Sequence, residues 1–400
     1  MTDPVPSARP EKPTSALEVF LVFLKLGLTS FGGPVAHLGY FNDAFVARRK
    51  WLNAAAYAEI VALCQFLPGP ASSQTGMMIG LSRARLPGAL AAWLGFTLPS
   101  AVLLAGFAYG AATLGDLTNA PWLHGLKIAA VAVVAQAIIG MSRSLCPDLP
   151  RILFAVLAAV LAIFMPTAAG QVGAIILGGL FGLLILKPAP GAALPDLPTA
   201  LSKPASIAAL MLFFALLAAL PLAAASDGLL LRLFDSFYRS GALVFGGGHV
   251  VLPLLQREVI PPGLIDPEMF LAGYGAAQAV PGPLFTFAAF LGAAIAGGWG
   301  ALVCTLAIFL PSFLLIIGVL PFWNSLRRRT GARAALQGIN AAVVGLLAAA
   351  FATLIVPTGI TRGIDAGIAV ALLVLLVVVR VPSWLIVALG AAASAAAALV

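Results

Sequence analysis

Two kinds of segment in this sequence interrupt apolar stretches with glycine and proline, and each kind occurs twice. Phe31-Gly32-Gly33-Pro34 returns as Phe245-Gly246-Gly247-Gly248 after 214 positions, and the segment Gln65 to Pro70 returns as Gln278 to Pro283 after 213 positions. Such a near-constant offset is typical of an internal duplication. A helix break at membrane depth is tolerated only where the backbone lines a cavity or is covered by protein. The paired breaks therefore predict a binding site for a transported ligand.

The chemistry of the breaks suits an anion. Each Pro-Gly-Pro begins a new helix whose first N–H groups are free, and these groups and the helix dipole attract negative charge. Hydroxyl and amide donors follow the first break. The alternative is that the prolines only kink packed helices, since proline is common in membrane helices. The candidate substrate-binding residues of the breaks are Phe31, Gly32, Gly33, Gln65, Pro68, Gly69, Pro70, Ser72, Ser73, Gln74, Phe245, Gly246, Gly247, Gln278, Pro281, Gly282 and Pro283.

Two cations occupy equivalent positions in the two copies. Lys25 lies six residues before Phe31, and Arg239 lies six residues before Phe245. A cation within an apolar segment is costly and is therefore a candidate functional residue. We expect Lys25 and Arg239 to face a shared cavity and to bind an anion from two sides. The alternative is that each side chain extends to its nearest membrane surface.

Three further ionisable residues near the breaks are candidates for proton coupling, namely His37, His249 and Glu59. A histidine titrates near neutral pH, and an intramembrane carboxylate is a candidate functional residue. The two histidines are not equivalent in the duplication, because His249 aligns with Val35. The alternatives are structural hydrogen bonds for the histidines and, for Glu59, an ion pair with Lys25 or a position near the cytoplasmic rim.

The composition is that of an integral membrane protein. Of the 400 residues, 62% are hydrophobic and 9% are charged, and the mean hydropathy is +1.07. The net charge of +8 resides mostly in short loops, where it sets membrane topology, so nucleic acid is not an expected partner. Phosphate-loop, HExxH and GxSxG motifs are missing from the sequence, and its three cysteines lack metal-site spacing. We expect no enzyme activity, no cofactor and no metal site.

The apolar stretches predict an all-α polytopic membrane protein built from two repeats. Each repeat begins with Gly/Pro-interrupted helix hairpins and continues with spans of the length needed to cross a bilayer. These spans lie near 86–110, 122–141, 151–166 and 170–186, and then near 299–320, 335–356, 363–381 and 382–400. The expected division is a disordered cytoplasmic tail (1–15), a first transporter repeat (16–186), a linker (187–228) with a connecting transmembrane helix (206–225), and a second repeat (229–400).

Loop charges predict that the second repeat has inverted topology. Lysine and arginine concentrate in cytoplasmic loops. The basic Arg48-Arg49-Lys50 corresponds to the uncharged Pro262-Gly263-Leu264, whereas residues 115–121, which contain no lysine or arginine, correspond to the region of Arg327 to Arg333. In a parallel repeat, corresponding loops would lie on the same side of the membrane and would carry similar charges. We expect the N-terminus in the cytoplasm and the C-terminus outside.

The ordered set of motifs at 31–37, 65–70, 245–249 and 278–283 resembles the chromate ion transporter family, specifically its long-chain, two-domain members. The resemblance covers nearly the whole chain from about residue 17. It implies a carrier in the bacterial inner (plasma) membrane that exports chromate from the cytoplasm and confers chromate resistance, with sulfate as a related substrate. Gly248 stands where the first copy has Pro34, so the two halves are not expected to contribute equally.

Several functional alternatives stay open from the sequence. An inside-negative potential drives a dianion outward by about 4.6 kcal/mol per 100 mV, so export by alternating access needs no ATP. A sulfate or other small-anion transporter, an anion channel and a non-transporting scaffold are the other candidates. The residues do not distinguish uniport, exchange and proton coupling. Chromate or sulfate and the lipid bilayer are the expected partners, and a homodimer is one option for the oligomeric state.

Overall fold

The structure is a computed structural model that describes residues 15–113, 120–188, 201–224 and 228–398. Within these ranges the secondary structure is helical and no strand occurs, as the apolar stretches predict. Apart from Ser15, the expected cytoplasmic tail lies outside the described residues. Most of the 115–121 loop and residues 189–200 and 225–227 of the linker also lie outside them.

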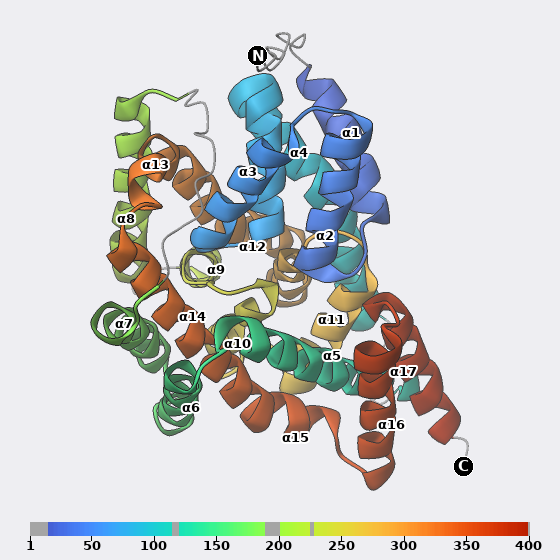
Figure 1. The fold of residues 1–400 in the computed structure, drawn as a ribbon. Coiled ribbons are helices and arrows are strands. Elements are labelled where there is room, and N and C mark those ends of the chain that lie inside the picture. The colour runs from blue at the N-terminus through green and yellow to red at the C-terminus, as the bar shows by residue number, and fades with distance from the viewer. Residues whose placement is uncertain (1–14, 114–119, 189–200, 225–227, 399–400) are drawn as a thin grey trace, which may run out of the picture.

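In the first half, helices end and begin at the predicted breaks (Figure 1). Polar caps fix two of the helix starts, because Ser15 Oγ accepts the Glu18 N–H at 3.1 Å and Asn53 Oδ1 accepts the Ala56 N–H at 2.8 Å. The helices are α1 (Ala16–Thr29), α2 (Gly33–Phe41), α3 (Ala54–Phe66), α4 (Ala71–Thr113), α5 (Pro121–Leu145), α6 (Leu149–Phe164) and α7 (Ala168–Ile185), with a π-helical turn at Asn42–Arg48 after α2.

The second half repeats this order after the connecting helix α8 (Lys203–Ala224). α9 has 14 residues like α1, and α11 has 13 residues like α3. The helices are α9 (Leu229–Ala242), α10 (Val251–Val259), α11 (Pro267–Ala279), α12 (Phe287–Val319), the short α13 (Trp323–Leu326), α14 (Thr330–Ala350), the short α15 (Val356–Gly359), α16 (Gly363–Val374) and α17 (Ser383–Ala397).

α4 and α12 are helical hairpins. A straight helix of the 43 residues of α4 would extend about 65 Å, far more than a bilayer. The chain instead turns at Ala84 and Arg85, so that Gly80 lies against the carbonyl group of Gly88. α12 turns in the same way at Ala296 and Gly297, with Gly292 against Gly300. The predicted boundary between the broken units and the spans near 86–110 and 299–320 is therefore confirmed.

The backbone angles of the two turns show how closely the halves repeat each other. Ala84 and Ala296 have φ/ψ of −138°/28° and −140°/24°, and Arg85 and Gly297 have 55°/−148° and 63°/−153°. The second of these conformations is one that glycine adopts readily and other residues rarely do. The first half therefore holds an arginine in a glycine-like conformation.

Five helical stretches are long and apolar enough to cross a membrane, and two of these are the hairpins α4 and α12. The chain is thus a multi-pass membrane protein. By contrast, α1, α3, α9 and α11 are about 20 Å long at 13 or 14 residues each, which is shorter than the bilayer core of about 30 Å. A helix of this length that begins at a membrane surface would end within the bilayer, so we expect the breaks that follow these helices to lie at membrane depth.

The halves pack against each other through equivalent pairs of helices. α7 packs on α14, and α5 packs on α17. Because α5 corresponds to α14 and α7 to α17 in the repeat, the two contacts are equivalent. Small residues allow these helices to approach closely. A Cβ added to Gly178 would lie 2.7 Å from the carbonyl oxygen of Gly338, and Gly125 faces the backbone of Gly390. The cysteines Cys64, Cys146 and Cys304 are buried and free.

Candidate functional site

The breaks of one half contact the breaks of the other through the backbone. The N–H of Gly69 donates to the carbonyl oxygen of Val244 at 2.7 Å, and the N–H of Gly282 donates to the carbonyl oxygen of Ser30 at 2.9 Å. Gly69 and Gly282 are repeat equivalents, as are Ser30 and Val244. The two hydrogen bonds are therefore reciprocal, and the four predicted breaks form one assembly.

Glycine is required at these two positions for two reasons. Gly69 and Gly282 have φ of 120° and 100°, which disfavours any residue with a side chain. A Cβ on Gly69 would also lie 2.6 Å from Ser312 Oγ, and one on Gly282 would lie 2.8 Å from Ser100 Oγ. Ser100 follows Pro99 and Ser312 follows Pro311, so the duplication repeats this Pro-Ser pair after 212 positions. That repetition was the signal that could have placed them at the site.

A cavity of about 1040 Å³ lies beside the first Pro-Gly-Pro. Residues at the breaks form one part of its wall, namely Gly69 of the first Pro-Gly-Pro, Ala71 at the start of α4, and Gly246 and Gly247. The first turn of α4 thus presents the positive end of a helix of the hairpin to the cavity. The other lining residues come from α2, α3, the end of α5, the linker and the stretch α13–α14, and include Pro34, Gln65, Leu145, Pro188, Trp323 and Asn340.

The cavity is strongly basic. Arg327, Arg328 and Arg333 line it, and Glu59 is the only acidic residue among its described lining residues. Arg327 donates from a terminal guanidinium nitrogen to Glu59 Oε1 at 2.7 Å, and the Trp323 indole N–H donates to the same oxygen. The described lining residues thus include three arginines and one carboxylate, a composition suited to an anion.

Neutral polar groups also lie near the breaks. Asn340 Oδ1, Ser73 Oγ and Gln74 Oε1 are buried and have no hydrogen-bond partner within the described part of the chain. Gln74 Nε2 donates to the carbonyl oxygen of Pro68 at 2.7 Å. Gln65 is exposed to the cavity. Five of the predicted substrate-binding and coupling residues line this cavity, namely Gln65, Gly69, Gly246, Gly247 and Glu59.

The structure does not bring Lys25 and Arg239 to this cavity. The Lys25 side chain is exposed on α1, on a face away from the buried Val22, Phe23 and Gly27. Arg239 lies between two carboxylates, at 2.7 Å from Asp235 Oδ2 and 2.9 Å from Glu258 Oε1. Its charge is therefore already neutralised within α9 and α10. The arginines of the α13–α14 region occupy the cavity instead.

The remaining predicted residues pack around the breaks outside the cavity lining. His37 is buried, with Nδ1 at 3.3 Å from Ser72 Oγ, and His249 Nδ1 lies 2.6 Å from the Tyr274 hydroxyl. Phe31 contacts Trp384 of α17, with ring centroids 5.9 Å apart. The others that the cavity does not include are Gly32, Gly33, Pro68, Pro70, Ser72, Ser73, Gln74, Phe245, Gln278, Pro281, Gly282 and Pro283.

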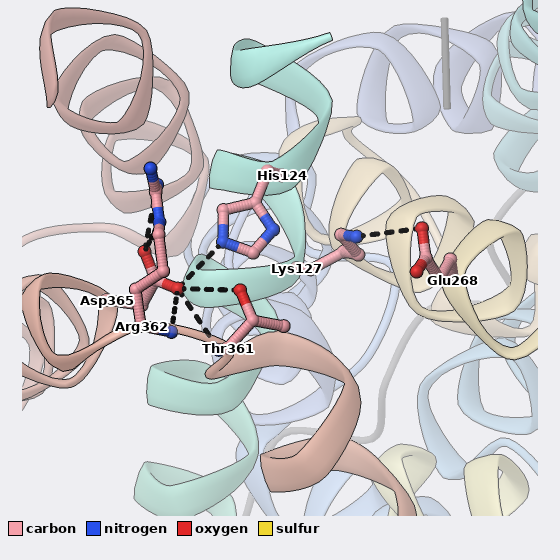
Figure 2. Close-up of polar contacts among 6 residues, drawn as sticks. All are labelled: His124, Lys127, Glu268, Thr361, Arg362 and Asp365. Atoms are coloured by element: carbon pink, nitrogen blue, oxygen red, sulfur yellow. Dashed lines mark hydrogen bonds and ion pairs between the residues drawn. The ribbon is translucent and has the colours of Figure 1, made fainter. Parts of the chain in front are cut away.

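A second set of ion pairs joins the halves away from the cavity (Figure 2). Lys127 Nζ on α5 lies 3.2 Å from Glu268 Oε2 on α11, and His124 Nε2 lies 3.0 Å from Asp365 Oδ2 on α16. Asp365 also accepts hydrogen bonds from Thr361 and Arg362. In Figure 1 the turn between α15 and α16 lies at the bottom of the molecule, whereas α13 lies in the upper half, on the same side as the N-terminus.

Comparison with known proteins identifies the family. A family model described as "Chromate transporter" matches residues 17–183 and 231–395. The chain belongs to the chromate transporter family. The unmatched stretch between the two parts of the family model contains α8, the helix without a repeat counterpart.

Named chromate transporter family members resemble the chain over most of its length. A "Chromate transport protein" of Pseudomonas aeruginosa is 30% identical over 87% of this chain and 83% of its own. A "Probable chromate transport protein" of Synechococcus elongatus is 28% identical over 83% and 82%, and a "Chromate transport protein" of Cupriavidus metallidurans is 26% identical over 84% and 82%. No solved structure matches the chain significantly. Membership of this family indicates a transporter rather than an enzyme.

Proposed function

We propose that this protein is a secondary transporter that exports chromate, a tetrahedral oxyanion, from the cytoplasm by alternating access and so confers chromate resistance. Family membership and the printed names of its relatives support chromate as the substrate. The observation that carries the proposal is the arginine-lined cavity that reaches the first Pro-Gly-Pro at Gly69 and the start of α4 at Ala71. Arginine side chains and free helix N–H groups are the donors that bind tetrahedral oxyanions.

The direction of access follows from the arginines. Arg327, Arg328 and Arg333 line the cavity, and clusters of basic residues mark the cytoplasmic side of a membrane protein. The cavity then opens to the cytoplasm, with the N-terminus on the same side and the C-terminus outside, in the bacterial inner membrane. On the far side, the Lys127–Glu268 and His124–Asp365 pairs hold the halves together. This arrangement corresponds to an inward-facing carrier.

The repeat supplies the means of alternation. Inverted repeats let two halves exchange conformations about a fixed midplane site, which opens the site to either side in turn. The inverted orientation is supported by the loop charges and is compatible with the reciprocal hydrogen bonds at Gly69 and Gly282. In this scheme the substrate site is made by the cavity wall at Gln65, Gly69, Gly246 and Gly247 together with the arginines, and the two domains are residues 16–186 and 229–400.

Counterflow of labelled chromate and sulfate in proteoliposomes tests the proposal. We expect saturable chromate uptake that unlabelled sulfate competes for, since both ions are tetrahedral dianions. Membrane potential and pH gradient are imposed separately, which distinguishes uniport, exchange and proton coupling. The matched variants are Arg333→Gln, which should lose most of the uptake, and Arg143→Gln, which removes an arginine outside the cavity lining and should not. Ohmic current without saturation would indicate a channel, and absence of flux for either ion would refute the transporter.

A further inference from the structure

Glu59 is an unexpected residue in a cavity for anions. Its side chain is 0% exposed, and it is the only carboxylate among the described residues that line the cavity. Oε1 accepts hydrogen bonds from Arg327 and Trp323, whereas Oε2 is buried and has no partner within the described chain. A buried carboxylate that uses only one of its oxygens is incompletely satisfied.

The position of Glu59 creates a conflict with substrate binding. A carboxylate in the cavity repels an incoming dianion, and it also occupies the guanidinium group that an oxyanion would use. The Arg327 side chain is 12% exposed, so its environment is partly dry and its attraction for either anion is strong. The two anions therefore compete for one arginine.

We propose that Glu59 is a resident counter-ion of Arg327, which pairs with the arginine when the cavity is empty and which the oxyanion displaces on binding. This inference rests on the proposed function. When the cavity is empty, Glu59 offsets part of the cost of burying the Arg327 charge. It also lowers the affinity for the substrate, so that bound oxyanion is released when Glu59 returns to Arg327. Glu59 is thus a positioning residue that sets the affinity and the rate of release.

A purely structural ion pair is the competing explanation. Glu59 lies on α3 of the first half, and Arg327 follows α13 of the second half, so the pair could serve only to join the halves. In that case replacing Glu59 would weaken the fold and would not strengthen anion binding. The two explanations predict opposite changes in affinity.

Equilibrium binding of radiolabelled sulfate to the purified full-length protein in detergent separates them. We expect Glu59→Gln to lower the Kd for sulfate about tenfold, a typical coupling between two ligands of one site. In proteoliposomes the same variant should lower KM and also lower kcat, because release becomes slow. The matched control is Asp148→Asn, which alters an aspartate–arginine pair outside the cavity lining, with 2.9 Å between Arg151 Nε and Asp148 Oδ2, and keeps a capping side chain.

Trp323 provides a second readout, because its indole N–H contacts the displaced carboxylate. Saturating sulfate should change the tryptophan emission of the unmodified protein, and Trp323→Phe should abolish that part of the change. If Glu59→Gln does not fold, Glu59→Asp weakens the contact and should lower the Kd about threefold, a fraction of the same coupling. An unchanged or higher Kd in the folded variants, or no emission change from Trp323, would overturn the inference alone. Failure of the unmodified protein to bind any sulfate or chromate would overturn the proposed function, and the inference with it.

Discussion

The amide of Gly69 and the carbonyl of Val244 lie 2.7 Å apart and form a hydrogen bond between the two halves of the chain. Gly282 makes the equivalent bond to Ser30 at 2.9 Å. At the membrane depth that we expect for these bonds, an unsatisfied peptide group costs several kcal/mol. The broken helices are therefore stable only because each half completes the backbone pairing of the other.

Alanine at Gly69 or Gly282 should be strongly destabilising. The positive φ costs a residue with a side chain about 1–2 kcal/mol, and the new Cβ would also lie 2.6 Å from Ser312 Oγ in the first case. We expect lower thermal stability in detergent and loss of transport. Gly140→Ala is the matched control, because a Cβ there meets no atom within 4 Å and alanine favours a helix. Equal melting temperatures for Gly69→Ala and the unmodified protein would contradict this account.

The cavity arginines should differ in their effects on transport. Arg328 is exposed, and an exposed charge acts mainly on the rate of association. Arg328→Gln should therefore raise KM about two- to fivefold and reduce its dependence on salt. Arg327→Gln removes a more buried donor and should reduce kcat/KM at least about tenfold, which corresponds to about 1.4 kcal/mol. Lys25→Gln should change kcat/KM less than about twofold, because the Lys25 side chain lies outside the cavity lining.

The ion pairs in Figure 2 should hold the far side of the transporter closed. The Lys127 side chain is 5% exposed, so removing its partner Glu268 leaves a buried cation without a counter-ion. Glu268→Gln should weaken the contact between α5 and α11 and increase labelling of a Gln278→Cys variant by an impermeant thiol reagent added outside. The parent protein without Gln278→Cys is the background control, since its own cysteines are buried. Unchanged labelling would show that the pair does not restrict access.

The turn of the α4 hairpin offers a stabilising substitution. Arg85 has φ 55° and ψ −148°, a conformation in which a non-glycine residue is strained by about 1–3 kcal/mol. Arg85→Gly should relieve this strain and raise the melting temperature, after about 0.5–1 kcal/mol is lost to the greater freedom of glycine in the unfolded chain. Gly297→Ala, at the equivalent turn of α12, should do the opposite. A lower melting temperature for Arg85→Gly would exclude strain as the dominant effect.

The sequence predicted what local chemistry decides. Glycine and proline interrupt a helix whatever its tertiary contacts are, so the breaks at Gly32 and Gly69 could be predicted from the sequence. Each motif occurs twice, which gave a second indication of each break. The direction in which a side chain points depends on tertiary packing. The equivalent positions of Lys25 and Arg239 in the two repeats therefore did not indicate which residues line the cavity. Lys25 faces outward on α1, and Arg239 is neutralised by Asp235 and Glu258, which have no counterparts in the first half.

The arginines of the cavity could not be found by repetition, because they occur in one half alone. Their cluster from Arg327 to Arg333 indicated only the side of the membrane. The contact of Arg327 with Glu59 joins residues 268 positions apart, and no sequence pattern links them. Glu59 forms an ion pair in the structure, and its partner is Arg327 and not Lys25.

The exchange of backbone hydrogen bonds between Gly69 and Val244, and between Gly282 and Ser30, also bears on biosynthesis. A half-molecule inserted alone would expose unpaired peptide groups at its broken helices and should be degraded by membrane proteases. Two halves made as separate polypeptides would still carry every group needed to satisfy each other. We therefore expect the halves to associate without a polypeptide connection, which would then serve to supply them in equal number.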